Sequence, residues 1–310
     1  LNYPKLEILV LDDCSQDKTS DIIRKFAHRG VRFLEGTPPP KSWVAKNHAY
    51  DQLLDNASGE LILFCGTDVR FEPQSLRLLV EAFMVNNRSM ISVLPLRSVH
   101  YDRHFLLQPM RYYRELVLPS RDPPALSTCW IAKRKMLIKH GGFEALRKSI
   151  RPERIIARGV ALKGNYAFIS ASSGLGITSQ KDLKAQWMTA VRTRYPELKS
   201  RPESILFTLI WQLFILSGPF ITLLYGLYLA ELLIIFISAL SILYLFTIHL
   251  LVSDIVTGKP RAHTLLLYPL SIILEITVTI YSMIAYEFME VIWKGRNVCL
   301  PVLQTNLRLP

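Results

Sequence analysis

The sequence contains few cysteines and no recognisable cysteine framework. Only four are present, without Cys-x-x-Cys spacing, which argues against a disulfide scaffold or a zinc site built from cysteine pairs. They are Cys14, Cys65, Cys129 and Cys299. We therefore expect reduced thiols in a cytosolic domain. His100 and His104 lie four residues apart, but no third ligand follows at a useful spacing, so a surface or loop role is favoured over a metal pair.

Charged residues are almost absent from the last third of the chain. Residues 205–252 contain one charged side chain, Glu231, and residues 264–292 contain only Glu275, Glu287 and Glu290. About 20 apolar residues in a helix cross the ~30 Å hydrocarbon core of a bilayer. A soluble core helix of this length would need a polar face. We therefore predict a membrane anchor, with two spans in the first stretch, separated between residues 219 and 228, and one segment in the second.

Basic residues crowd the segment before the first span. The formal net charge is +12, and residues 147–201 contribute much of the excess. Such residues beside a span indicate the cytoplasmic side and anionic lipid head groups, so we expect a membrane partner and no nucleic acid. Lys259 and Arg261 fit a cytoplasmic return of the hairpin, whereas Lys294 and Arg296 conflict with a third crossing. The third segment is therefore either a membrane span or a re-entrant or interfacial helix.

Strand and helix signals alternate along the first half. We expect strands at residues 6–11, 31–34 and 61–65, and helices at residues 19–28, 45–56 and 74–85. This order predicts an α/β domain with a mostly parallel sheet. Ligands bind beyond the carboxyl ends of such strands, where Asp12, Asp13 and Asp68 follow apolar runs. A dinucleotide-binding domain is disfavoured, because the chain contains no Gly-x-Gly-x-x-Gly turn.

Four motifs in register, within three stretches of the chain, carry a family resemblance. They read YPKLEILVLDDCSQDKT, PKSWVAKNHAYDQLLDNASGELILFCGTDVRFEP and KRKMLIKHGGFEAL. In order and spacing they resemble the family 2 glycosyltransferases of the GT-A fold over roughly residues 3 to 200. The resemblance implies a nucleotide-sugar-binding domain at residues 1–203, whose first strand is expected to precede Leu1, and a transmembrane helical region at residues 204–310.

The resemblance also assigns the donor site. It implies that Asp12 and Asp13 bind the ribose and base of a nucleotide sugar, with Asp13 the first choice. It places Lys46 at the donor phosphates and Asp68 on a divalent metal, Mn²⁺ or Mg²⁺, which stabilises the leaving diphosphate. The family's first metal aspartate is replaced by Gly66, which predicts a weakened or rearranged metal site. A turn role for Asp13 and a solvated role for Lys46 are the alternatives.

Two further residues are candidates on the acceptor side. Counting back eleven residues from Gly164 places Glu153 where the family has its general base, although a surface helix-start role is the alternative. Trp187 is all that remains of the Gln-x-x-Arg-Trp pattern of processive members. It is a candidate acceptor platform or, equally, an interfacial anchor.

These assignments together predict a multi-pass membrane enzyme with a cytoplasmic catalytic domain. We expect it to be an inverting, metal-assisted glycosyltransferase that moves a single sugar to a lipid or lipid-linked acceptor. The alternatives are an inactive nucleotide-sugar-binding or scaffolding protein and a processive polysaccharide synthase. Loss of Gln-x-x-Arg-Trp counts against the synthase.

Overall fold

The computed structural model describes residues 2–97, 108–116, 118–259, 262–293 and 296–303. His100, His104, Arg261 and Lys294 lie outside the described residues. The chain divides into two compact units. Unit 1 comprises Leu1–Pro95, Leu118–Ile177 and Val298–Leu307, and unit 2 comprises Leu96–Val117, Thr178–Asn297 and Arg308–Pro310. The predicted boundary at residue 203 stays a prediction.

Unit 1 contains two groups of strands. Strands β1 (Ile8–Asp12) and β2 (Val31–Glu35) pair in parallel. The larger sheet has the order β3 (Leu61–Cys65), β7 (Cys129–Lys133), β5 (Met90–Leu94) and β8 (Tyr166–Ser170). Strand β7 runs antiparallel to β3 and β5, while β5 and β8 are parallel. The sheet is therefore parallel in β3, β5 and β8, as predicted, with β7 as the one reversed strand among those four.

Helices and short elements complete unit 1. They are α1 (Thr19–Arg24), η1 (Ala27–Arg29), α2 (Ala45–Asn56), β4 (Val69–Phe71), α3 (Ser75–Val85), α5 (Arg134–Lys139), η3 (Glu144–Leu146), α6 (Pro152–Ala161) and α12 (Cys299–Leu303). The predictions for residues 45–56 and 61–65 match α2 and β3 residue for residue. The helix predicted for residues 19–28 is shorter, because the chain changes to a 3-10 turn that closes at Gly30 with φ 78°.

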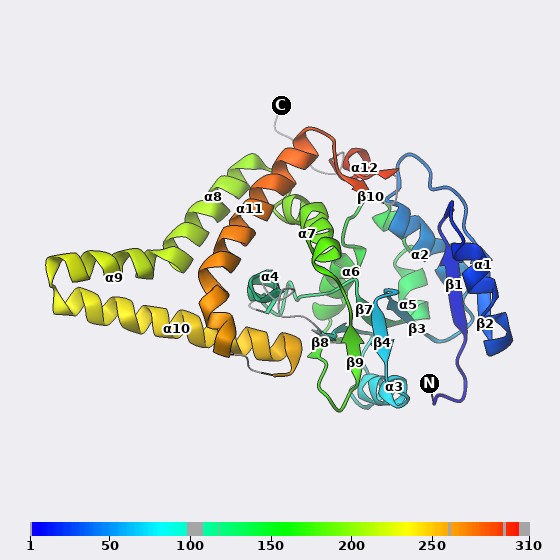
Figure 1. The fold of residues 1–310 in the computed structure, drawn as a ribbon. Helices are drawn as coiled ribbons and strands as arrows, with labels where there is room; N and C mark the ends of the chain where they lie inside the picture. Colours follow the sequence, from blue (N-terminus) through cyan, green and yellow to red (C-terminus); the bar gives the residue numbers. More distant parts are fainter. Residues whose placement is uncertain (1, 98–107, 117, 260–261, 294–295, 304–310) are drawn as a thin grey trace. The chain divides into compact units, whose positions relative to one another are not determined.

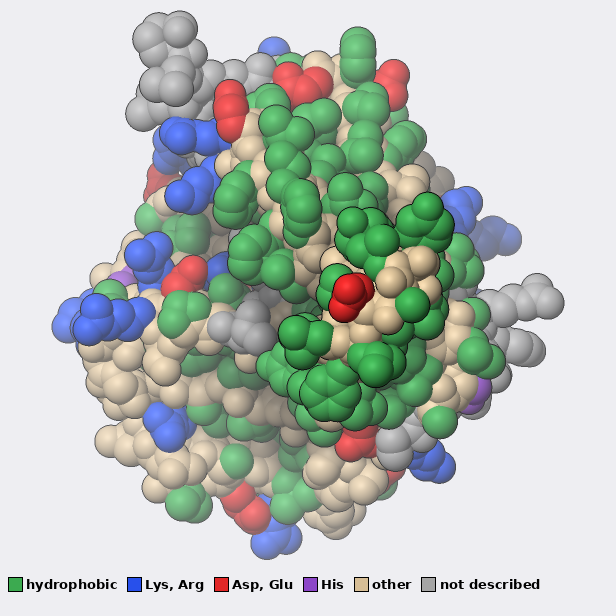
Figure 2. Space-filling model, turned by 90° about the vertical axis from the view of Figure 1, so that its left-hand side faces the viewer, with side chains coloured by type: hydrophobic (Ala, Val, Ile, Leu, Met, Phe, Trp, Pro, Cys, Tyr) green, Lys and Arg blue, Asp and Glu red, His purple; other side chains and the backbone are tan. Residues whose placement is uncertain are grey.

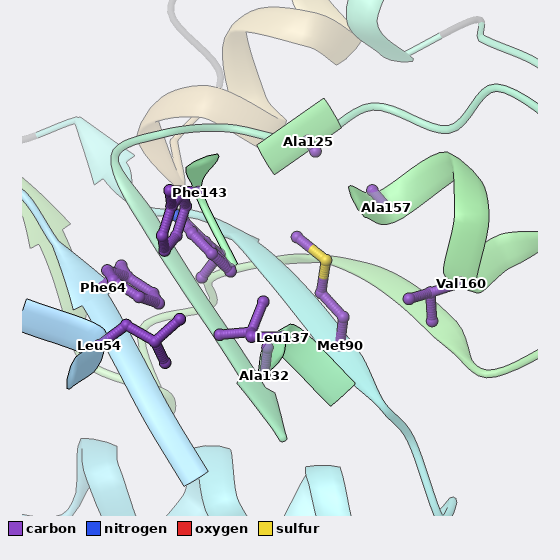
Figure 3. Close-up of a cluster of buried hydrophobic side chains, with 10 residues drawn as sticks. Leu54, Phe64, Met90, Ala125, Ala132, Leu137, Phe143, Ala157 and Val160 are labelled. Carbon is purple, nitrogen blue, oxygen red and sulfur yellow. The ribbon is translucent and has the colours of Figure 1, made fainter. Parts of the chain in front are cut away.

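An aromatic cluster forms the core between α2 and the larger sheet (Figure 3). Phe64 on β3 stacks on Trp130 of β7, with ring centroids 4.2 Å apart, and the two residues are opposite each other in the strand register. Phe143 packs edge-on against Phe64 at 5.5 Å. Stacked and edge-on aromatic pairs contribute about 1 kcal/mol each beyond the burial of their area. This core fixes the end of β3, where Asp68 follows.

Unit 2 consists mainly of long helices (Figure 1). Its elements are β6 (Leu96–Arg97), α4 (Gln108–Leu116), α7 (Leu183–Glu197), α8 (Pro202–Gln212), the π-helical turn η4 (Leu213–Ser217), α9 (Gly218–Leu229), α10 (Leu232–Thr257), η5 (Ala262–Leu267), α11 (Tyr268–Glu287), β10 (Ile292–Trp293) and β11 (Arg296–Asn297). Strand β9 (Ile177–Ser179) begins at the end of unit 1 and pairs in parallel with β6.

Among the described residues, three helical segments are long and apolar enough to cross a membrane: Pro202–Leu229, Leu232–Thr257 and Ala262–Glu287. Figure 2 shows the predominantly apolar face that they present. The first two separate at Ala230 and Glu231, just after the predicted break between residues 219 and 228. Pro219 lies in the first turn of α9, where proline is compatible with a helix. The helical segment therefore continues from the π-helical turn through Pro219 into α9.

Candidate functional site

The turn after β1 is organised by Asp12. Its buried carboxylate accepts the Ser15 N–H at 3.2 Å through Oδ1 and the Ser20 hydroxyl through Oδ2. Gly36 at the end of β2 donates its N–H to the Asp12 carbonyl at 3.0 Å. A side chain at Gly36 would collide with this carbonyl, with its Cβ 2.6 Å from the oxygen. Asp12 therefore shapes the turn, and Asp13 is the half-buried carboxylate next to it.

The end of β3 forms a tight turn that carries Asp68. The Gly66 N–H donates to the Thr128 carbonyl at 2.9 Å, and the Val69 N–H donates back to the Gly66 carbonyl at 3.1 Å. The Asp68 carboxylate folds over Gly66, because a Cβ built on that glycine would collide with Asp68 Oδ1. An aspartate at position 66 would thus require Asp68 to move. Gly66 leaves room for the Asp68 carboxylate as observed, whereas an aspartate there, as at the family's first metal position, would need the Asp68 side chain to rotate away.

A metal site here would rest on few protein ligands. Among the described residues, no group of three or more His, Cys, Asp or Glu side chains lies close enough to hold a metal ion. Mg²⁺ commonly takes only one or two protein carboxylates and completes its shell with substrate phosphates and water. A single carboxylate, Asp68, is compatible with that kind of site. It is not enough for a site in which every ligand comes from the protein.

Lys46 and Glu153, predicted for different roles, contact each other. Lys46 Nζ lies 3.2 Å from Glu153 Oε2 and donates to the Ile150 carbonyl at 3.1 Å. The Glu153 side chain is fully buried, whereas that of Lys46 is 27% exposed. Arg151 Nε lies 3.8 Å from Glu153 Oε1, so the carboxylate faces two cations. The structure thus joins α2 to the start of α6 through a buried ion pair.

Asn47 strengthens the same junction, and sequence reasoning missed it. Its side chain is fully buried, and Nδ2 donates to the carbonyls of Leu146 and Ser149, each at 2.7 Å. The Val44 N–H donates to the Arg147 carbonyl at 2.8 Å. The N-terminal end of α2 therefore holds the segment that leads to Glu153. No sequence signal reveals this role, because the acceptors lie about 100 residues away along the chain.

The backbone conformation of the Gly-Gly-Phe motif explains its two glycines. Gly141 and Gly142 have φ values of 82° and 62°, which most side chains disfavour. The following N–H, from Phe143, donates to Asp51 Oδ1 on α2 at 3.1 Å. Burial raises the pKa of the Asp51 carboxyl above its usual value, and the charges of Asp55 and Glu144 add to this, while the Phe143 hydrogen bond opposes it.

Trp187 lies in unit 2, on α7. Its ring packs against Tyr281 of α11, with centroids 5.9 Å apart. Tyr281 is 47% exposed. A Trp–Tyr pair with one exposed ring fits the interfacial-anchor alternative better than a sugar platform, because both rings have a polar edge that favours the membrane–water boundary.

Comparisons with known proteins agree with this architecture. Residues 1–141 match the family model described as Glycosyl transferase family 2. The mannosyltransferase PcManGT from Pyrobaculum calidifontis, solved with GDP-Man and Mn²⁺, has a similar fold, with a TM-score of 0.51 and 16% identity over 95% of this chain and 81% of that chain. TarS 1–349 from S. aureus, in complex with UDP-GlcNAc, gives a TM-score of 0.40 and 14% identity over 93% and 84% of the two chains. Comparison with curated proteins gave no match.

Proposed function

Residues 1–141 form a domain of glycosyltransferase family 2, and from this premise we propose the reaction. The enzyme moves one sugar from a nucleotide-sugar donor to a lipid or lipid-linked acceptor at the cytoplasmic membrane face, with inversion and with help from a divalent metal. The observation that supports this proposal is the presence of carboxylates just after β1 and β3. The same chain has three helical segments, among the described residues, that are apolar enough to cross a membrane. In open α/β sheets such strand ends are where ligands bind.

The donor is proposed to bind across these two turns. Asp12 is engaged by Ser15 and Ser20, so its role is to hold the turn, and Asp13 is proposed to accept hydrogen bonds from the ribose or base. The related fold of a mannosyltransferase solved with GDP-Man supports a nucleotide sugar as the donor class. We leave the sugar and the base of the nucleotide unassigned.

Asp68 is proposed as the protein ligand of Mn²⁺ or Mg²⁺. When bound, the metal would neutralise charge on the leaving diphosphate. The turn at Gly66 presents a single carboxylate, so the donor's own phosphates would have to complete the shell. We therefore expect metal and donor to bind interdependently.

Glu153 is proposed to position Lys46. A general base must reach the acceptor hydroxyl, whereas the Glu153 carboxylate is fully buried between Lys46 and Arg151. Holding the Lys46 ammonium in place would let it meet the donor phosphates. If Glu153 positions Lys46, Glu153→Gln raises the KM for the donor and leaves kcat within a few fold. If Glu153 is the base, the same change lowers kcat by about 10² to 10⁴ at unchanged donor KM.

The hairpin of α8, α9 and α10 is proposed to cross the bilayer. Exposed tyrosines lie near its tip, with Tyr225 57% and Tyr228 85% exposed, and Trp211, 57% exposed, lies farther toward its base. Trp211 precedes the turn at Ala230 by 19 residues, about 28 Å of helix. Two aromatic groups at roughly this separation match the two interfaces of a membrane. The anchor and the exposed basic residues beside it favour a lipid acceptor.

Donor turnover by the membrane-bound enzyme tests the site. Release of nucleoside diphosphate is measured with Mn²⁺ and with EDTA, for wild type, Asp13→Ala and Asp68→Ala. We expect each variant to lose at least about 100-fold in rate, because each removes an interaction that binds or stabilises the donor. EDTA should abolish the wild-type rate. The matched control is Glu60→Gln, an exposed carboxylate just before β3, which should retain full activity. Full, EDTA-resistant activity in Asp68→Ala would contradict the proposal.

A further inference from the structure

The third apolar helix, α11, has two unlike faces. Its inner face is buried and carries polar side chains: Ser271, Glu275, Thr279 and Ser282. Its outer face is exposed and mostly apolar: Leu270, Ile273, Ile280, Tyr281 and Ile284. Polar residues inside and apolar residues outside indicate that protein covers one face and lipid the other.

The protein that covers the inner face is α7, and the seam between them is polar. Glu275 forms a buried ion pair with Arg194 of α7, which supplies the partner that the sequence could not name. Further along, the Tyr195 N–H donates to Ser282 Oγ at 3.0 Å, and Tyr286 donates its hydroxyl to the Arg192 carbonyl at 2.7 Å. Helix α7 thus contacts α11 between Glu275 and Tyr286. Because α7 also carries exposed Lys184, a crossing by α11 would draw several charges of α7 into the hydrocarbon, at a cost of several kcal/mol.

The segments before and after α11 both lie close to a boundary between the two units along the chain. Helix α10 ends at Gly258, where a Cβ would contact the Leu96 side chain at 3.4 Å. Leu96 opens β6 and follows β5 of unit 1 after a single residue, Pro95. After α11, Val298, Cys299 and Val302 are buried, and residues 298–307 belong to unit 1. Both flanks of α11 are therefore close to points at which the chain passes from one unit to the other, and this favours the same side of the membrane for both.

Helix α11 also runs across the base of the α9–α10 hairpin and not alongside it (Figure 1). Its first turns share a buried cluster with α10 that includes Leu245, Tyr268 and Ile272. On the outer face of α11, Tyr281 packs against Trp187 of α7. The polar edges of Trp and Tyr rings favour the level of the lipid head groups in a membrane. The exposed basic residues Lys184, Lys199 and Arg201 lie on or just after α7.

We propose that α11 does not cross the membrane but lies along its surface, with its two flanking segments on one side. Its outer face rests among the head groups and upper acyl chains, as interfacial helices do. Lys184, Lys199 and Arg201 would complement anionic lipids there. The anchor then makes two crossings, α8–α9 and α10, and the positive residues after α11 no longer conflict with their side. This inference is independent of the proposed sugar transfer.

Thiol labelling from either side of sealed vesicles tests the proposal. The background carries Cys14→Ser and Cys65→Ser and keeps Cys129 and Cys299, which are buried. Single cysteines are then placed before and after α11, by His263→Cys and Glu290→Cys, both at exposed positions. Exposed Cys65 of the wild type reports the side of unit 1. We expect an impermeant maleimide to label all three from the same side. Labelling of residue 290 only from the side opposite to residue 263 would overturn the proposal.

Spin-label depth gives a second readout that does not depend on vesicle orientation. Nitroxides at Leu270 and Ile284, both exposed, lie 14 residues apart, about 21 Å along the helix. A helix along the surface places both labels at a similar shallow depth, as judged by collision with oxygen and a nickel chelate. A crossing helix would place them at opposite interfaces, accessible from opposite sides. A label at Leu240 of α10, 57% exposed, is the deep reference.

Discussion

Single carboxylates in unit 1 owe their behaviour to what surrounds them. Asp12 accepts hydrogen bonds within its own turn, and Glu153 faces two cations. Asp51 accepts a backbone N–H from the Gly-Gly-Phe motif. The sequence identified Asp12 and Asp68 as strand-end residues, because an apolar run followed by aspartate is a local signal. It could not reveal the Lys46–Glu153 pair, whose partners are 107 residues apart. The roles predicted for the site residues all stay predictions: Asp12, Asp13, Lys46, Asp68, Glu153 and Trp187.

The raised pKa of Asp51 gives a pH-dependent prediction. A carboxyl whose folded pKa lies above its unfolded pKa destabilises the fold when ionised, and this penalty declines as the pH falls through the folded value. Asp51→Asn removes the charge and keeps an oxygen that can accept the Phe143 N–H. We therefore expect the variant to raise Tm by a few degrees at pH 7.5 and to lose this advantage as the pH is lowered through the raised pKa of Asp51 toward about 4, the ordinary range of an aspartate carboxyl.

Tryptophan fluorescence during thermal unfolding of the detergent-solubilised protein measures this difference. Glu60→Gln, at an exposed carboxylate, is the control and should leave Tm unchanged at both pH values. An Asp51→Asn variant that is less stable than wild type at pH 7.5 would show that the carboxylate charge itself is needed by the turn.

At the scale of secondary structure, helices and strands could be predicted where the sequence signals are local. Helix α2 and strand β3 match their predictions because both are bounded by turn residues and carry clear patterns. The reversal of β7 was not foreseen, since its direction depends on pairing with β5 and β3, whose partner residues are 38 to 72 positions away along the chain. The break of the hairpin was placed a few residues too early, because Pro219 and the glycines near it looked like a turn and instead lie within a helix.

The tip of the α9–α10 hairpin yields a topological prediction. Glu231 caps the start of α10 and is exposed, and a carboxylate there is costly if the hairpin ends within the hydrocarbon. We expect Glu231→Cys, in the Cys14→Ser and Cys65→Ser background, to be labelled only from the side opposite to unit 1. Labelling from the side of unit 1, or protection from both sides, would mean that the hairpin does not cross. Ser217→Cys, halfway along the rod, serves as the control for a site expected to be protected.

At the scale of the whole molecule, a segment that matches the glycosyl transferase family 2 model is followed by helices long and apolar enough to cross a membrane. The sequence was sufficient for this combination, because hydropathy and motif order are both properties of the linear chain. The two compact units are interleaved along the chain: residues 96–117 belong with the helical unit and residues 298–307 with unit 1. Such exchanges depend on packing between distant segments, which a hydropathy profile does not contain.

Sugar transfer into lipid is the measurement that tests the central claim most directly. Membranes containing the full-length enzyme are incubated with a panel of nucleotide sugars labelled in the sugar, in the presence of Mn²⁺, and the organic extract is counted. The account predicts label in the extract from one or a few donors, in proportion to the nucleoside diphosphate released, and its loss in Asp68→Ala. Absence of label from every donor, in a protein that still binds the nucleotide, would contradict the account and favour a nucleotide-sugar-binding scaffold.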